Sequence, residues 1–376
     1  MNAPATPPST SAPTDPDLAE QARPGHGIPS QDPTPSAQTP LKPEEAEREA
    51  KSALMGGGVL AGAVTGAVIG TAIAGPVGVL VGGTAGAVAG ALGGAAAGNI
   101  VNPMEFVDSD TVRLHIEDSG GSGRPVLLIH GWPLSAEAWA PQAVALRAAG
   151  YRVVAYDRRG FGWSDKPESG YSYDTLADDL QRLMEHRGLQ DVTLVGFSMG
   201  GGEVARYIAR HGESRLRSVV FAAAIPPYLM KTADNPDGPF MPEMAQQMKQ
   251  SLEQDRDSFF EQFTKLFFSA KGALQVTESQ RGDAVRLCHQ SAQNAALACM
   301  ESFATTDFRD DLKKVQVPTL VIHGDADAIV PIEGSGQLTH RAIPHSQLVV
   351  VKGAPHGLNV SHAQAFNEAL LSFLRA

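Results

Sequence analysis

A serine between two glycines follows an apolar run near the middle of the chain, and this arrangement could supply a catalytic nucleophile. The segment Gly196-Phe197-Ser198-Met199-Gly200 comes directly after Val192-Thr193-Leu194-Val195. A serine on a sharp turn from a strand into a helix has strained backbone angles, and glycine lets the neighbouring backbone pass closely. The turn would hold the hydroxyl of Ser198 out of the sheet and aim the backbone N–H of Met199 at the group under attack. The pattern therefore predicts nucleophilic chemistry at Ser198.

A carboxylate and an imidazole, which a serine nucleophile needs, follow at the ends of two later apolar runs. Residues 318–322 lead into a turn that holds Asp327, and residues 348–351 lead into a loop that holds His356. A free hydroxyl is a poor nucleophile at neutral pH, so a base must take its proton. We predict that His356 is this base and that Asp327 orients it and stabilises its charged form. The chain order Ser198, Asp327, His356 is the order expected of an α/β-hydrolase.

A fourth apolar run ends where a second oxyanion donor is needed. Residues 125–129 lead into His130-Gly131-Trp132-Pro133. We predict that the backbone N–H of Trp132 joins that of Met199 in holding the oxyanion of an acyl-transfer reaction. Four strand ends then converge on one reaction, and this combination is far more specific than any single motif.

Six stretches spread over residues 105–376 carry a resemblance to a known family: HGWPLSAEAW, YDRRGFGWSDKP, YDTLADDL, GFSMGGGEVARY, VIHGDADAIVP and KGAPHGLNVSH. By these stretches the sequence resembles the cofactor-free bacterial haloperoxidases, also called perhydrolases or aryl esterases, of the α/β-hydrolase superfamily. The resemblance implies a Ser-His-Asp triad and neither a metal nor a heme. It does not extend to residues 1–104.

Other residues compete for the roles of base and acid. His130 and His323 each precede a glycine directly after an apolar strand, which favours buried structural roles for both. His356 lies in a loop in the last third of the chain, as the expected order of the triad requires. The family pattern H-G-x-x-D selects Asp327 over Asp325, which we expect to stabilise its loop.

Pro133 has two interpretations. A proline fixes φ and lacks an N–H, so it could simply shape a turn. The resemblance suggests instead that this loop accompanies perhydrolase activity, with the Trp132 carbonyl accepting a hydrogen bond from hydrogen peroxide or a peracid. We expect Pro133, Phe197 and Ile329 to lie at the substrate.

The elements that position these residues form an α/β pattern. Strand-like runs occur near residues 112–117, 125–130, 151–156, 191–196, 216–222, 318–323 and 346–351. Helical segments separate most of them, which predicts an α/β-hydrolase fold with a mostly parallel, doubly wound sheet over residues 105–376. The strand signal vanishes over residues 225–307, where phenylalanines recur at helical spacing. We expect a helical cap there, over the strand ends where ligands bind in such sheets.

The first part of the chain has a different composition. Residues 1–43 hold eleven of the 26 prolines, and no aromatic residue precedes Phe106. Such a segment cannot bury a core, so we expect a disordered tail. Residues 44–104 are expected to form a short charged helix and then a helical hairpin rich in glycine and alanine.

The hairpin expectation rests on a strict glycine period. No charged residue occurs over residues 52–104, and glycine recurs at every fourth position on either side of Gly75-Pro76. A period of four places glycine on one face of a helix, and each half of about 22 residues would be roughly 33 Å long, enough to cross a hydrocarbon core. This pattern predicts two helices packed through glycine grooves, a glycine zipper. The alternatives are a helix that self-associates in solution or at a surface, and a flexible linker.

These observations set expectations for location and function. Lys42, Arg48 and Lys51 flank the hairpin, which favours membrane association with the catalytic domain on the cytoplasmic side; the alternative is a cytoplasmic protein. The net charge of −11 argues against a nucleic-acid surface. Epoxide hydrolases and haloalkane dehalogenases share the expected fold but need an aspartate where this chain has Ser198.

We therefore expect a metal-free serine hydrolase that acts on a small ester or a carboxylic acid, with water or hydrogen peroxide as the second substrate. One alternative is a plain carboxylesterase or lactonase. The other is a membrane or assembly protein that uses the hydrolase domain as a scaffold.

Overall fold

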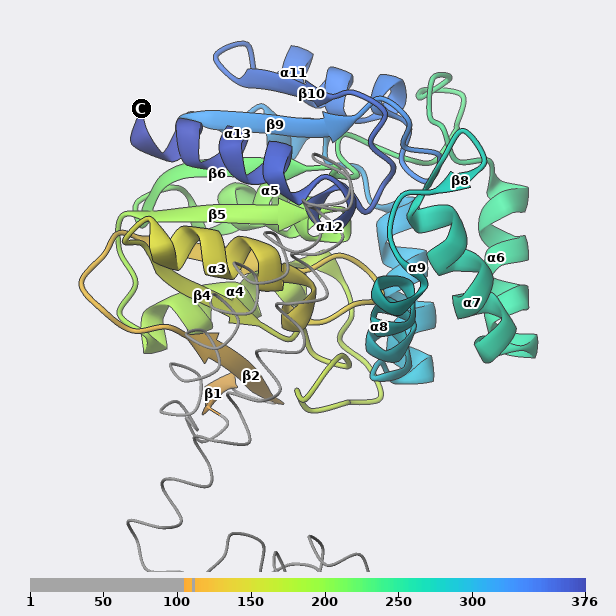
Figure 1. The fold of residues 1–376 in the computed structure, drawn as a ribbon, viewed down its shortest axis with the longest axis horizontal. Helices are drawn as coiled ribbons and strands as arrows, with labels where there is room; N and C mark the ends of the chain where they lie inside the picture. The colour runs from red at the N-terminus through yellow and green to blue at the C-terminus, as the bar shows by residue number, and fades with distance from the viewer. Residues whose placement is uncertain (1–104, 110–111) are drawn as a thin grey trace, which may run out of the picture. The chain divides into compact units, whose positions relative to one another are not determined.

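An eight-stranded β-sheet forms the centre of the structure, a computed structural model that describes residues 105–109 and 112–376 (Figure 1). The tail and the glycine-zipper hairpin expected over residues 1–104 lie outside the described residues. The strands, in spatial order, are β1 (Glu105–Ser109), β2 (Val112–Asp118), β4 (Arg152–Tyr156), β3 (Pro125–Ile129), β5 (Val192–Phe197), β6 (Leu216–Ala222), β9 (Thr319–Gly324) and β10 (Gln347–Val351). The pairs β1–β2 and β2–β4 are antiparallel and the other pairs of this sheet are parallel. The sheet is thus mostly parallel, as the sequence predicts, whereas β1 was not expected.

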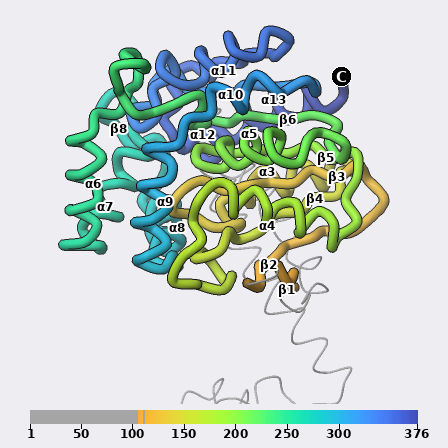
Figure 2. Tube along the Cα trace, turned by 180° about the vertical axis from the view of Figure 1, so that it is seen from behind, coloured from red at the N-terminus to blue at the C-terminus, as the bar shows by residue number. Residues whose placement is uncertain are grey.

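The central strands are apolar throughout because helices cover both faces of the sheet. All six residues of β5 and all six of β9 are buried. Helices α3 (Ala140–Ala148) and α13 (Ala363–Arg375) lie on one face, and α4 (Tyr173–His186) and α5 (Met199–His211) lie on the other (Figures 1 and 2). A strand buried on both faces is apolar throughout instead of alternating, which is why these runs are easy to read in the sequence.

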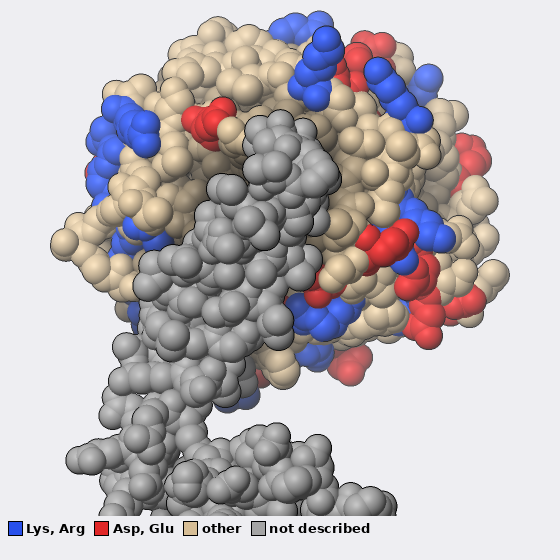
Figure 3. Space-filling view, in the orientation of Figure 1, with Lys and Arg blue, Asp and Glu red and all other residues tan. Residues whose placement is uncertain are grey.

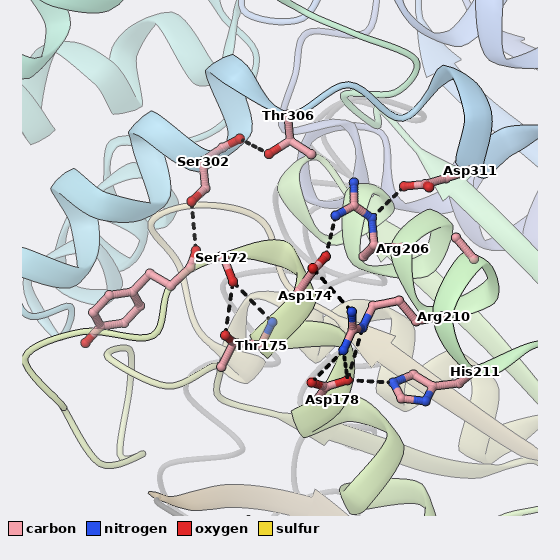
Figure 4. Close-up of polar contacts among 12 residues, drawn as sticks. Ser172, Asp174, Thr175, Asp178, Arg206, Arg210, His211, Ser302, Thr306 and Asp311 are labelled. Carbon is pink, nitrogen blue, oxygen red and sulfur yellow. Dashed lines mark hydrogen bonds and ion pairs between the residues drawn. The ribbon is translucent and has the colours of Figure 1, made fainter.

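Ion pairs hold α5, the helix that follows Ser198, against its neighbours (Figure 4). Arg206 pairs with Asp174 on α4, and its Nε lies 2.7 Å from Asp311 on the short helix α10 (Arg309–Leu312). One turn further on, Arg210 binds Asp178 of α4 at 3.0 Å. On the face drawn in Figure 3, acidic and basic side chains lie in scattered groups, mainly towards the edges, and both signs occur close together at the right-hand side.

Four helices lie beyond the carboxyl ends of the strands, in the segment where the sequence predicts a cap (Figure 1). They are α6 (Pro242–Gln254), α7 (Arg256–Phe267), α8 (Glu278–His289) and α9 (Gln293–Thr305). A two-stranded ribbon, β7 (Ser269–Ala270) and β8 (Ala273–Leu274), interrupts them and was not expected from the sequence. Its turn residues Lys271 and Gly272 have φ values of 51° and 77°, the left-handed angles that join the strands of a tight hairpin.

The remaining helices are short and follow the last two strands of the sheet. They are η3 (Ile332–Gly334), α11 (Gly336–Ala342) and α12 (Leu358–Ser361), and a further 3-10 helix, η2 (Ala136–Trp139), precedes α3. Within residues 105–109 and 112–376, no helix combines the length and the hydropathy that a membrane span requires. The same residues contain no cluster of His, Cys, Asp or Glu side chains suited to holding a metal ion.

Candidate active site

Ser198 lies on the turn between β5 and α5, in the strained conformation that its motif predicts. Its φ of 53° and ψ of −118° fall outside the favoured regions for a residue with a side chain. The flanking glycines are needed because the backbone passes so closely here. A Cβ atom on Gly196 would lie 2.5 Å from the carbonyl oxygen of Gly200, and one on Gly200 would lie 2.6 Å from that of Ile129.

Ser198, His356 and Asp327 form one chain of hydrogen bonds. Nε2 of His356 lies 2.9 Å from Oγ of Ser198, and Nδ1 of the same ring lies 2.7 Å from Oδ2 of Asp327. All three side chains are buried. Because a carboxylate only accepts, the Nδ1 proton belongs to the imidazole, and Nε2 is left free to accept the serine proton. The geometry is that of a nucleophile, a base and a residue that orients the base.

The Asp327 carboxylate has further donors that hold it ionised. Its Oδ1 accepts the backbone N–H groups of Ile329 at 2.9 Å and Val330 at 2.8 Å. Burial by itself raises the pKa of Asp327, but the nearby rings of His356 and His323 outweigh burial and bring that pKa far below its ordinary value. A carboxylate kept charged in this way can stabilise an imidazolium on His356 during catalysis.

The residues that compete for the roles of acid and base, Asp325, His130 and His323, make no hydrogen bond to Ser198 among the described contacts. Asp325 is exposed, and its Oδ1 accepts the backbone N–H of Gly353 at 2.5 Å, which ties its turn to the loop after β10. His130 is fully buried, where burial and the charge of Arg158 lower its pKa to about 3. His323, expected to be purely structural, has its Nε2 3.2 Å from Oδ2 of Asp327. No sequence signal could have given this contact, because it depends on how the turn after β9 folds back.

The loop expected to supply the oxyanion donor lies against the nucleophile turn. A Cβ atom on Gly131 would lie 2.7 Å from the Phe197 ring and 3.1 Å from Cβ of Ser198. The next residue, Trp132, is buried, and its indole N–H donates to the carbonyl of Ala296 on α9 at 2.9 Å. Met199 is the first residue of α5, where backbone N–H groups have no partner within the helix. The peptide bond between Trp132 and Pro133 is cis.

A buried ion pair anchors the same loop from behind. Nε of Arg158 donates to Glu203, five residues beyond the nucleophile on α5. The Nη2 group of Arg158 donates to the carbonyl of His130 at 2.7 Å. The backbone N–H of Arg158 donates to Nε2 of His130 at 3.0 Å. The strand end before Trp132 is thereby tied to the helix that Ser198 begins.

An apolar pocket of about 660 Å³, open mouth included, reaches Ser198 and His356. Its other lining residues are Trp132, Ile225, Leu229, Phe240, Met244, Met248, Phe263, Leu266, Phe303, Ala328, Ile329 and Val330. Most of them come from the segment between β6 and β9, which the sequence marks only as a cap.

The three expected substrate residues lie in different places. Ile329 lines the pocket, whereas Phe197 and Pro133 are not among its lining residues. The Phe197 ring is buried and packs on the His356 ring, with ring centroids 5.2 Å apart, so it supports the imidazole from behind.

Comparisons with known proteins agree with this fold. A family model described as the alpha/beta hydrolase fold matches residues 124–363. A putative non-heme chloroperoxidase of Synechocystis is 44% identical over 272 residues, which cover 71% of this chain and 97% of the relative. A bifunctional esterase/perhydrolase of Acinetobacter calcoaceticus is 35% identical over 71% of this chain and 98% of its own.

A solved structure is similar as well. The bromoperoxidase of Bacillus anthracis superimposes with a TM-score of 0.71 and 50% identity, covering 73% of this chain and all of its own. The chain therefore belongs to the α/β-hydrolase superfamily and is an enzyme of the group that contains the non-heme haloperoxidases and related esterases.

Proposed function

We propose that this enzyme cleaves carboxylic esters through an acyl-enzyme on Ser198, and that water or hydrogen peroxide then releases the acyl group. The observation that carries the proposal is the hydrogen-bonded chain from Ser198 through His356 to Asp327, with links of 2.9 and 2.7 Å. A serine hydroxyl so placed has a base within reach, and the base has a carboxylate to balance its charge.

In the first step, Nε2 of His356 takes the proton of Ser198 as Oγ attacks the ester carbonyl. The carbonyl oxygen becomes an oxyanion, which we assign to the backbone N–H groups of Trp132 and Met199. His356 then gives its proton to the departing alcohol oxygen, the bond from carbon to that oxygen breaks, and the acyl group remains on Ser198. Asp327 keeps its charge throughout.

In the second step, water or hydrogen peroxide takes the place of the alcohol. His356 removes a proton from the water or peroxide, whose oxygen attacks the acyl carbon. The bond from that carbon to Oγ of Ser198 then breaks, and Oγ takes back the proton from His356. Water yields a carboxylic acid and hydrogen peroxide yields a peracid, which could oxidise a halide away from the protein. The peroxide branch is supported by the names of relatives, among them the esterase/perhydrolase of Acinetobacter calcoaceticus.

The pocket favours an uncharged substrate. Apart from His356, its lining side chains are apolar or carry only the Ser198 hydroxyl and the Trp132 indole. A charged acyl group would lose its hydration there without a partner, at a cost of several kcal/mol. We therefore assign neutral aliphatic or aromatic esters as the substrate class.

Parallel assays of wild-type enzyme and Ser198→Ala test this function. Wild-type enzyme should hydrolyse p-nitrophenyl acetate and, with hydrogen peroxide present, form peracetic acid, whereas Ser198→Ala should do neither. Ester hydrolysis without peracid formation would remove the perhydrolase branch and leave a plain carboxylesterase. Equal turnover by both proteins would overturn the proposal.

We also propose that residues 52–104 bring the catalytic domain to a membrane, with an assembly role as the alternative. The support is the uncharged, glycine-periodic sequence of that segment. The full chain should pellet with membranes and resist carbonate extraction, whereas a chain lacking residues 1–100 should stay in the supernatant. A monomeric full-length protein that never pellets would leave only the linker interpretation.

A further inference from the structure

A second hollow lies beside the catalytic pocket, between the cap helices α6 and α7. It has a volume of about 1190 Å³, open side included. Its lining residues are Met244, Gln247, Met248, Ser251, Gln254, Asp255, Ser258, Phe259, Gln262, Phe263 and Leu266. All of them lie on α6, on α7 or at the joint between the two helices, so the hollow is a groove, called here the α6–α7 groove.

The α6–α7 groove and the catalytic pocket meet at four shared side chains. Met244, Met248, Phe263 and Leu266 line both spaces. Methionine is unbranched and adapts its shape to what it contacts, so two methionines at the junction form a wall that a ligand can displace. An apolar chain that fills the pocket at Ser198 therefore has an apolar path into the groove.

Apolar side chains are also exposed at this junction. Met244 and Leu266 are 47% and 49% exposed. They are two of the six large hydrophobic residues that are exposed in the described part of the chain. Exposed apolar side chains that gather at one place mark a binding surface, whereas scattered ones need no explanation.

Further from the junction, the groove is polar but nearly free of charge. Gln247, Ser251, Gln254, Ser258 and Gln262 supply amide and hydroxyl groups.

The one charged residue of the groove, Asp255, already has a partner. Its side chain accepts the backbone N–H of Ser258 at 2.9 Å and so caps α7. The groove thus offers an apolar end and a neutral, hydrogen-bonding end, and the described residues that line it include no cation that would hold an anionic group.

We propose that the α6–α7 groove holds the outer part of a long, uncharged acyl chain whose ester end lies at Ser198. This inference rests on the proposed function. The acyl group stays bonded to Ser198 through both steps, while the alcohol leaves and water or peroxide enters in its place. The apolar junction therefore gives the acyl group, which stays bound, a way out of the pocket into the groove. From Met244 to Ser251 the groove follows about 10 Å of α6, at 1.5 Å per residue.

The test compares two tryptophan substitutions on α6. Ser251→Trp places a large ring in the groove, at a position that is exposed and so tolerates the change. Gln250→Trp is the matched control, because Gln250 is the exposed neighbour that lines neither space. Each protein is assayed with p-nitrophenyl esters from acetate to decanoate, and the measured quantity is the ratio of kcat/KM for decanoate to that for acetate.

Ser251→Trp should lower this ratio about fifteenfold, since excluding two methylene groups removes about 1.6 kcal/mol of burial. Gln250→Trp should keep the wild-type ratio. The inference is overturned if Ser251→Trp leaves the ratio unchanged, or if both variants lower it equally. It is also overturned if the loss appears with acetate esters of long alcohols and not with long acyl chains. Absence of Ser198-dependent turnover with every ester would instead overturn the proposed function itself.

Discussion

Nε2 of His323 lies 3.2 Å from Oδ2 of Asp327, the same oxygen that accepts the hydrogen bond from Nδ1 of His356. The same Nε2 lies 2.8 Å from the carbonyl oxygen of Val330, which can only accept, so the His323 proton is on Nε2. Nδ1 of this ring is buried and has no hydrogen-bond partner among the described residues, and Gly336 packs against it. His323 thus holds both the Asp327 carboxylate and the turn that carries it.

Replacing His323 tests this role. His323→Leu should lower kcat about tenfold with little change in KM, because a hydrogen bond near a charged group contributes on the order of 1.5 kcal/mol. His323→Gln keeps an N–H donor at a similar reach and should recover most of the rate. Steady-state kinetics of the two variants, with circular dichroism spectra to check folding, separate the outcomes. Equal losses in both variants would show that His323 acts only through packing.

Asp327→Asn should lower kcat by about 10⁴, the loss that follows when an amide replaces the acid of such a triad. The amide cannot balance the charge of the His356 imidazolium and favours the wrong tautomer. Asp325→Asn is the matched control, since Asp325 bonds only the Gly353 backbone among the contacts described for its side chain, and should retain most activity. A larger loss in Asp325→Asn than in Asp327→Asn would reverse the assignment of the acid.

Pro133→Leu should lower peracid formation more than ester hydrolysis, by about fivefold in the ratio of the two rates. Proline fixes the backbone next to Trp132, and one hydrogen bond from peroxide to that backbone contributes about 1 kcal/mol. Both products are measured on the same enzyme sample, with the exposed Pro344→Leu as control. If hydrolysis and perhydrolysis fall together, Pro133 is a turn residue and nothing more.

Asp118 gives the catalytic domain a stability that depends on pH. Its carboxylate, on β2, accepts hydrogen bonds from Arg152 on β4 and Arg187 after α4. Burial raises the pKa of Asp118, but the two arginines outweigh burial and lower this pKa to about 2. A lowered pKa means that the stabilisation is complete above the ordinary value of 3.8 and is lost as the pH falls towards 2.

Asp118→Asn should therefore lower the free energy of unfolding at pH 7 by on the order of 2 kcal/mol. The difference from wild type should shrink between pH 4 and pH 2, as followed by urea unfolding at each pH. Asp310→Asn, which removes an exposed pair with Lys313, should leave the midpoint unchanged. A difference that stayed constant down to pH 2 would show that the carboxylate charge is not the cause.

Much of the fold and of the candidate site could be predicted from the sequence, because both rest on local patterns. Strands β5 and β9 are buried on both faces, so they read as continuous apolar runs. Ser198, Asp327 and His356 each follow such a run, and parallel strands bring their carboxyl ends to one edge of the sheet. The close approach of Gly196 to Gly200, within one turn of chain, is equally local.

The rest depends on contacts between distant segments. Leu229, Phe240 and Met244 line the pocket from a segment with helical periodicity but no motif. The β7–β8 ribbon turns on left-handed angles at Lys271 and Gly272, and a Lys-Gly pair is a weak signal for such a turn.

The central claim is that Ser198 carries the acyl group. The most direct measurement is mass spectrometry of the protein after treatment with a fluorophosphonate probe, followed by peptide mapping. The account predicts one probe adduct per chain, on the peptide that contains Ser198, and no adduct in Ser198→Ala, whose kcat should fall by about 10⁶. An unlabelled wild-type protein, or a correctly folded Ser198→Ala variant that keeps activity within tenfold of wild type, would contradict it.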